Sequence, residues 1–300
     1  MSRLDQLVYR YNTVLIVLAA ISYNLSIEYL SEKGYSAPSL LVYRGVLGSS
    51  LVAIMAWHQG VSLVPQKPRA QVIRFFNAGI ALLLAFESFH RINGVTVSTI
   101  QRLEIPFAVI LGVGLGHQVR DSKFTLSLLT VGLVLSSLLL ADKIGEDPIG
   151  LLMVIVAVAM TAVAYLLGKK SVILENNLTV LNVTNLGGLA IGGLVCILQG
   201  KFSFFHLADL WLIGTMTLSQ FILNYIMTVL FRHYDVARAQ RPYLLSSVCI
   251  LALEMVTGHR KFVPLHIAFV LLVVGMVYII TLHRPLRLIS PAQIKDPSIS

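Results

Sequence analysis

Charged residues are scarce in this chain of 300 residues: Asp, Glu, Lys and Arg make up 12%, whereas 56% of the residues are hydrophobic. An average soluble domain has about a quarter of its residues charged, so this scarcity excludes an ordinary soluble protein. The mean hydropathy of +0.81 supports the same exclusion. We therefore expect a polytopic membrane protein.

Cysteine is nearly absent too, and the two that are present, Cys196 and Cys249, lie inside apolar runs, which excludes a disulfide framework. The eight histidines lack the clustered spacing of metal ligands. The glycines of residues 112–116 follow a polar helix and not a strand, which excludes a dinucleotide-binding loop. We expect neither a metal nor a cofactor.

The first apolar run has no small-residue cleavage site after it, so we expect a retained helix and not a signal peptide.

The formal net charge of +9 would favour nucleic acid as the partner of a soluble protein. Here the basic residues lie mostly in short loops between apolar runs, which is the positive-inside pattern. With the N-terminus in the cytoplasm, that side has twelve Lys and Arg residues and the other side six. We expect both termini to lie in the cytoplasm and the protein to lie in a bacterial inner membrane. We expect a monomer or homodimer. Its expected partners are lipid and a small-molecule substrate, not nucleic acid.

Ten apolar runs are each about long enough to cross a bilayer, which takes roughly 20 helical residues. They lie near residues 12–30, 38–57, 71–91, 94–115, 122–141, 149–168, 180–198, 210–231, 236–257 and 263–282. The segment 142–148 divides them into five and five, and an odd number of spans per half turns the second half upside down. The expected fold is all-α integral membrane, with two inverted five-helix repeats at 1–143 and 144–284 and a cytoplasmic tail at 285–300.

Two stretches, residues 100–117 and 239–259, place ionisable residues inside apolar runs, where charge is costly and usually functional. Each has a Gln-Arg pair near its start and a Gly-His pair after its end: Gln101-Arg102 with Gly116-His117, and Gln240-Arg241 with Gly258-His259. The Gln-to-Gly spacing is 15 residues in the first stretch and 18 in the second. We interpret them as matching helices of the two halves. A further spacing, Gly188 to Gly192, predicts close helix packing within the chain.

Five short segments, spread from the first expected helix to the ninth, follow the pattern of one membrane-protein family. They are Ser22-Tyr23-Asn24, Leu41 to Gly45 with its Arg44, Leu103 to Phe107, Ala162 to Tyr165, and Phe231 to Ala239. Because these five segments occur in this order along the chain, it resembles the drug/metabolite transporter superfamily, specifically its EamA-type ten-helix members. It departs from them in the two Gly-His pairs, where they usually have Gly-Glu, and in Pro242, which lies earlier than their helix-nine proline.

The two Gln-Arg pairs are the first candidates for substrate binding. Arg102 falls close to the expected midplane and Arg241 on the other side of it, so we expect both to face one cavity. Arginine keeps its proton and presents a planar fork that suits carboxylate or phosphate. Arg102 and Arg241, with Gln101 and Gln240, would then contact an anionic or zwitterionic substrate. The alternative is that Glu104 or Glu87 neutralises Arg102.

The other intramembrane charges have two interpretations each. Arg44 and Glu87 lie at similar expected depths, which favours a structural ion pair. Glu104 and Glu254 are candidates for proton coupling, because burial raises a carboxyl pKa, or they are paired carboxylates.

Neutral polar side chains lie in four of the expected helices. Tyr23, Asn24, Tyr165 and Asn224 are candidate substrate contacts, and Gln220, Tyr225 and Tyr243 belong to the same group; the alternative for each is an interhelical hydrogen bond.

The resemblance implies a secondary transporter, usually an exporter, of a small organic metabolite, with alternating access at a midplane site. An amino acid or related zwitterion is the first choice, and exchange of a nucleotide-type solute, such as a nucleotide sugar or S-adenosylmethionine, is the alternative. A membrane-embedded lipid-modifying enzyme is the competing class, but no nucleophile, base or metal constellation gathers at one membrane face. A channel is disfavoured because nothing resembles a selectivity filter. We therefore expect a transporter and not an enzyme.

Overall fold

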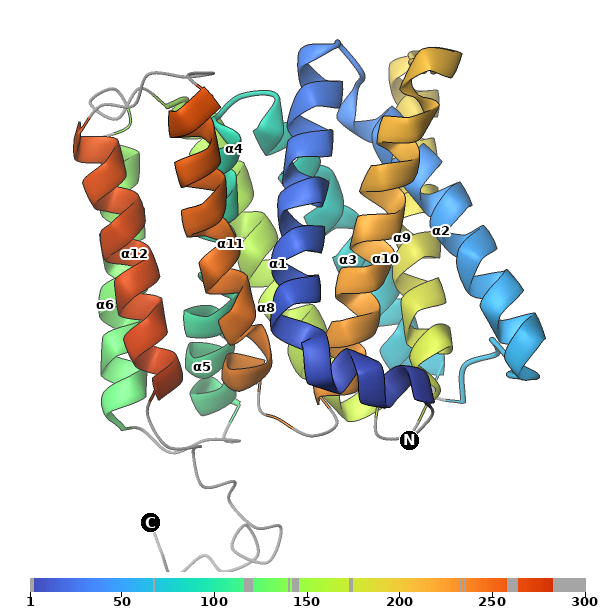
Figure 1. The fold of residues 1–300 in the computed structure, drawn as a ribbon, viewed down its shortest axis with the longest axis horizontal. Helices are drawn as coiled ribbons and strands as arrows, with labels where there is room; N and C mark the ends of the chain where they lie inside the picture. Colours follow the sequence, from blue (N-terminus) through green and yellow to red (C-terminus); the bar gives the residue numbers. More distant parts are fainter. Residues whose placement is uncertain are drawn as a thin grey trace, which may run out of the picture.

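The computed structural model describes residues 3–66, 68–115, 121–139, 141, 146–172, 175–231, 234, 236–257 and 264–282. Within these ranges every regular element is helical (Figure 1). Nine spans in the described residues are long and apolar enough to cross a membrane, the organisation of a multi-pass membrane protein. The predicted all-α fold is confirmed. The two Gly-His pairs and the tail at 285–300 lie outside the described residues.

The helices follow the predicted runs closely. The first half contains α1 (Arg3–Glu32), α2 (Ala37–Gln59), α3 (Pro68–Phe89), α4 (Gly94–Gln101), α5 (Glu104–Gly114) and α6 (Ser122–Leu139). The second half contains α8 (Pro148–Val172), α9 (Asn177–Gln199), the short 3-10 helix η1 (Leu207–Asp209), α10 (Leu210–Phe231), α11 (Val236–Thr257) and α12 (Pro264–Leu282). α4 and α5 together make one of the nine apolar spans, and α11, which is more polar, is a tenth helix of similar length.

The predicted fourth helix is divided, because Arg102 and Leu103 form a turn between α4 and α5. Pro106 explains the break, since proline has no backbone N–H and its ring collides with the carbonyl four residues earlier, that of Arg102. This carbonyl accepts a hydrogen bond from the Ile105 N–H at 3.3 Å instead. The span predicted over 94–115 is confirmed as one of the nine apolar spans, but its helix is broken, and Arg102 lies at the break.

Glycines allow α9 to pack closely on both α2 and α3. A Cβ atom on Gly192 would lie 2.8 Å from the Pro38 carbonyl oxygen of α2, and one on Gly79 of α3 would lie 2.5 Å from the Gly187 carbonyl oxygen. The predicted close packing around Gly192 is confirmed, with Gly187 as the contact toward α3. Helices can approach this closely only where the side chain is a hydrogen atom.

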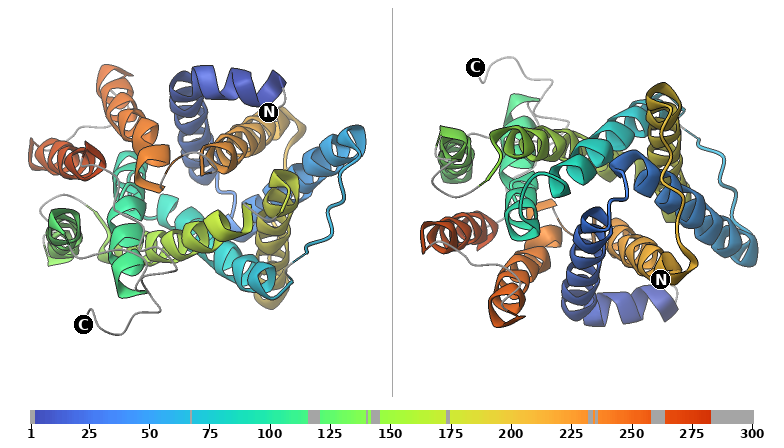
Figure 2. Two further views of the ribbon diagram at one scale, coloured as in Figure 1. Left: turned by 90° about the horizontal axis from the view of Figure 1, so that it is seen from below. Right: turned by 90° about the horizontal axis from the view of Figure 1, so that it is seen from above.

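The helices form a bundle with two distinct ends when it is seen along the helix axes (Figure 2). α6 packs on α12 at one end, and α2 packs on α9 at the other. Between them, α1 packs on α10 and α3 packs on α8, with α4, α5 and α11 toward the α6–α12 end. This arrangement surrounds the middle of the bundle with helices from both halves of the chain.

Candidate functional site

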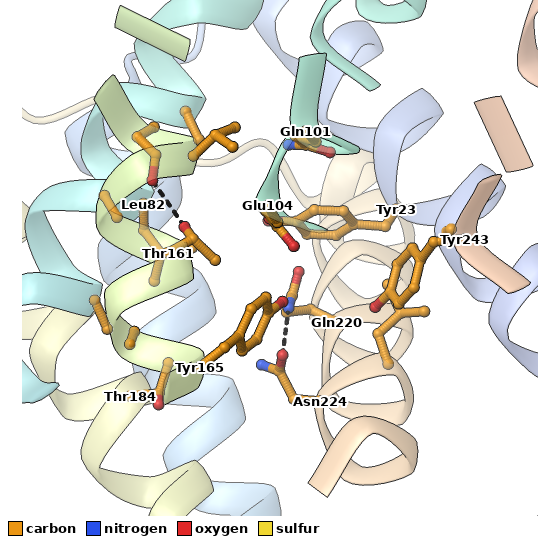
Figure 3. A pocket seen from close by; sticks show the side chains of 18 of the residues that line it. Tyr23, Leu82, Gln101, Glu104, Thr161, Tyr165, Thr184, Gln220, Asn224 and Tyr243 are labelled. Atoms are coloured by element: carbon orange, nitrogen blue, oxygen red, sulfur yellow. Dashed lines mark hydrogen bonds between the residues drawn. The ribbon is translucent and has the colours of Figure 1, made fainter. Parts of the chain in front are cut away.

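A cavity of about 120 Å³ lies in the middle of the bundle (Figure 3). It is lined from every long helix except α6 and α12. Apolar positions such as Ala81, Val154 and Leu223 form part of its wall. The polar lining residues are Tyr23, Asn24, Arg44, Arg74, Gln101, Arg102, Glu104, Thr161, Tyr165, Thr184, Gln220, Asn224 and Tyr243. Polar and charged side chains thus make up more of the described lining than in the mostly apolar pockets typical of small-molecule sites.

The break between α4 and α5 brings Gln101, Arg102 and Glu104 to the cavity. The Arg102 side chain is buried, and its Nε donates to the Ser98 carbonyl oxygen at 2.9 Å and to Ser247 Oγ at 3.2 Å. Its guanidinium also stacks over the Tyr243 ring, with 4.8 Å from Cζ to the ring centroid. Arg102 is therefore held from both α4 and α11.

Among the described lining residues, Glu104 is the one acidic side chain. Its Oε2 accepts a hydrogen bond from Gln240 Nε2 at 2.9 Å. The Tyr165 hydroxyl and the Gln220 amide face the same carboxylate from α8 and α10, and Gln220 in turn donates to Asn224 Oδ1 at 3.0 Å (Figure 3). The bond from Gln240, with the Tyr165 hydroxyl beside it, fixes the position of this carboxylate and partly satisfies it.

Arg44 is buried, with 1% of its surface exposed, and it lines the cavity from α2. None of its three guanidinium nitrogens has a hydrogen-bond partner among the described residues. The expected ion pair with Glu87 is not formed: no contact within 4.0 Å joins the two described side chains. The helix bounds explain why, because Arg44 is seven residues from the start of α2 whereas Glu87 is two from the end of α3. At about 1.5 Å per residue their backbones differ in depth by roughly 7 Å.

Arg74 is a lining residue that the sequence did not single out. It is buried on α3, and its Nε donates to Thr184 Oγ1 at 3.2 Å, while its Nη1 has no partner in the described part of the chain. The predicted run began at residue 71, which left Arg74 near a helix end. α3 begins at Pro68, and proline at the first position of a helix was the available signal for the earlier start. Thr161 and Thr184 are further lining residues that were not predicted.

Arg241 does not face this cavity. It is exposed, stacks over Tyr278 with 5.0 Å from Cζ to the ring centroid, and donates from Nη2 to the Tyr278 hydroxyl at 3.3 Å. Successive helical residues are about 100° apart, so Arg241 and Tyr243 point to nearly opposite sides of α11. Because Tyr243 lines the cavity, Arg241 points toward α12 and lines a separate hollow with Tyr234 and Pro242.

The structure thus places six of the eight predicted substrate contacts together: Tyr23, Asn24, Gln101, Arg102, Tyr165 and Asn224. Gln240 is next to them, because it binds Glu104, whereas Arg241 is apart. Glu254 is buried on α11 but does not line the cavity.

Neither a protein-family model nor a curated protein matches this chain. A solved structure, described only as "Crystal structure of protein", matches with a TM-score of 0.65 at 14% sequence identity, over 90% of this chain and 96% of that one. At this identity the likeness shows the fold alone. The chain therefore has the helical bundle of a known structure around a polar, charged cavity.

Proposed function

We propose that this protein is a secondary transporter of a small organic metabolite, which works by alternating access between two inverted five-helix halves. The observation that supports this proposal is the cavity, which residues from both halves of the chain line at a recurring separation. Tyr23 and Tyr165, and Gln101 and Tyr243, are each 142 residues apart, and all four line it. A site at the interface of two repeats is the plan of many secondary transporters.

Helix boundaries support the internal repeat. α2 and α9 each have 23 residues, begin 140 residues apart at Ala37 and Asn177, and end before a left-handed glycine, Gly60 (φ 63°) or Gly200 (φ 60°). The later helix pairs begin 142 residues apart: α3 and α10 at Pro68 and Leu210, α4 and α11 at Gly94 and Val236, and α6 and α12 at Ser122 and Pro264. Five spans per half turn the second half over.

Helix packing supports it as well. If each helix is exchanged for its counterpart, the contact of α1 with α10 becomes that of α8 with α3, and both contacts exist. The contact of α5 with α6 becomes that of α11 with α12, which also exists. The α2–α9 and α6–α12 contacts are their own counterparts. A two-fold relation between the halves accounts for all of these contacts together.

The repeat also accounts for the position of Arg241. The two Gly-His pairs are 142 residues apart, in step with the helix starts, whereas the two Gln-Arg pairs are 139 apart. Arg102 and Arg241 are therefore not equivalent positions. Gln101 corresponds to Tyr243, and it is Tyr243, not Arg241, that contacts Arg102.

An amino acid or related zwitterion, exported from the cell, is the substrate class that the resemblance to EamA-type transporters favours. The cavity offers arginines for a carboxylate and Glu104 for an ammonium group. A nucleotide-type solute would need a larger space than about 120 Å³. Engineered cavities of about 150 Å³ take a ligand the size of benzene.

The test is flux in liposomes that contain the purified protein. Labelled amino acids, lactate, methyl phosphate, nucleotides and S-adenosylmethionine would be offered with and without a pH gradient and with and without solute inside. We expect flux of a small compound, and we expect Arg102→Gln to reduce it while the loop variant Lys201→Gln, at an exposed position, does not. Accumulation that follows the pH gradient would indicate proton coupling, and flux that needs solute on both sides would indicate exchange. Lack of flux for every compound would contradict the transporter and favour the lipid-modifying enzyme.

A further inference from the structure

We infer that the cavity binds an organic anion, whose carboxylate or phosphoryl oxygens lie between Arg44 and Arg74. This inference rests on the proposed function for the site's role, but it replaces the zwitterion that the resemblance favours with an anion. It depends on two arginines that lie against the same helix, on their guanidinium nitrogens that have no hydrogen-bond partner among the described residues, and on the charge balance of the lining.

The two guanidinium groups come from different helices and approach one face of α9. Arg74 of α3 donates to Thr184, and Arg44 of α2 lies beside Gly188, where an added Cβ would be 3.6 Å from its Nη1. Thr184 and Gly188 are four residues apart, so they lie one above the other, about 6 Å along the helix axis. Both arginines also line the cavity. They are therefore placed like the two sides of a clamp on one small ligand.

Neither arginine has the partners that a buried charge requires. Arg44 has no hydrogen bond from any of its three nitrogens to a described residue, and Arg74 has none from Nη1. The guanidinium stays charged in proteins, and an unpaired buried charge costs several kcal/mol, so such groups are normally paired or bound to a ligand. The planar guanidinium fork matches the two oxygens of a carboxylate or phosphate. The missing partner is thus an oxyanion.

The carboxylates near these arginines do not supply that partner. Glu104 is bound by Gln240 and lies toward Arg102. Glu175 accepts a hydrogen bond from Gln71 at 3.0 Å, and no ion pair within 4.0 Å joins it to Arg74. The lining residues that the structure describes include three arginines and one carboxylate, which leaves an excess of positive charge. The cavity therefore favours an anion over a neutral zwitterion.

The volume of about 120 Å³ limits the anion to a small one. By comparison with the cavity of about 150 Å³ that takes benzene, it suits roughly five or six non-hydrogen atoms. Short organic acids and small phosphate esters fall near this range. Both present the same oxyanion chemistry to the clamp.

Binding can be measured without transport, by isothermal titration calorimetry on the full-length protein in lipid nanodiscs. The probes would be lactate, methyl phosphate, inorganic phosphate and alanine, each of five or six non-hydrogen atoms. We expect at least one anion to bind more tightly than alanine, and its affinity to fall about tenfold or more in Arg44→Met and in Arg74→Met, because a charge-assisted hydrogen bond is lost in each. Binding of lactate alone would indicate a carboxylate site, and binding of the phosphates a phosphoryl site. Lys201→Gln, outside the cavity, is the matched control that keeps the affinity.

A second readout separates ligand binding from a structural role. Replacement of an unpaired buried charge by an apolar residue of similar length is commonly neutral or stabilising, so Arg44→Met is expected to unfold at the same or a higher temperature than the parent without ligand. A structural ion-pair role predicts the opposite. Tight alanine binding without anion binding, or full anion affinity in both methionine variants, overturns the inference. Anion binding without flux would leave the inference in place and contradict only the transporter proposal.

Discussion

The side-chain amide of Gln240 on α11 donates a hydrogen bond to Glu104 on α5, with 2.9 Å between Nε2 and Oε2. The two residues belong to helices that correspond in the two proposed halves, and Glu104 lines the cavity. This bond therefore joins the two halves directly at the candidate site. A rocking motion between the halves would have to carry it along or break it.

Gln240→Ala is expected to destabilise the protein by about 1–3 kcal/mol, because it leaves a part-buried carboxylate oxygen without this donor. Thermal unfolding in detergent measures the loss. Gln59→Ala, at the exposed end of α2, is the control and should change little. Equal unfolding temperatures for the parent and Gln240→Ala would show that the bond contributes nothing to stability.

Asp147 provides a pH-dependent contribution to stability at the start of α8. Its Oδ1 accepts from the Ile149 N–H at 3.1 Å, and its Oδ2 accepts from Arg91 Nη1 at 3.3 Å. The Ile149 N–H bond and then the Arg91 bond hold the pKa of this carboxyl below its usual value of 3.8. A lowered folded-state pKa stabilises the protein above the unfolded value, and this stability is lost as the pH falls below about 3.8.

The measurement is the unfolding temperature of the parent and of Asp147→Asn between pH 3 and pH 7. We expect the difference between the two to be constant at the upper end and to shrink at the lower end. A difference that grows as the pH falls would contradict the assigned sign.

The apolar runs were sufficient to locate the spans, because a run of roughly 20 apolar residues has few alternatives to a membrane helix. The break at Arg102 could also have been anticipated, since Pro106 removes a helical hydrogen bond four residues earlier. The face of α11 that points to the cavity could not be anticipated. Aligning the two halves on the Gln-Arg pairs gives one register for α11, and aligning them on the Gly-His pairs gives another. Which side chains find partners depends on packing between distant helices, so the unpaired state of Arg44 is visible only in the structure.

Gly187 is the position where α9 tolerates a side chain least. A Cβ atom there would collide with the backbone carbonyl oxygen of Phe75 on α3. A backbone atom cannot rotate away, so Gly187→Ala must push α3 and α9 apart, which costs about 1–3 kcal/mol. Gly193→Ala, on the same helix but with open space around the added methyl, is the matched control. Thermal unfolding of the two variants should differ clearly, and equal values would show that the two helices do not pack as closely as described.

Pro106→Ala tests whether the break between α4 and α5 serves the site. Alanine restores a backbone N–H that can bond to the Arg102 carbonyl, and it removes the ring that collides with that carbonyl. Arg102 and Leu103 can then join a continuous helix, which draws the Arg102 side chain away from Ser247 and Tyr243. Because alanine is also a better helix former than proline, we expect higher thermal stability together with weaker anion binding and slower flux of whichever compound is carried.

Pro264→Ala is the control for this variant, because Pro264 lies at the first position of α12, where a helix does not need the N–H. It should leave binding and flux at the parent level. Two results for the stability, anion binding and flux of Pro106→Ala lead to opposite conclusions about the break. Higher stability with reduced binding means that the chain gives up helical hydrogen bonds to hold Arg102 at the cavity. Higher stability with unchanged binding and flux means that neither depends on the break, which is the result expected if Arg44 and Arg74 alone carry the anion site.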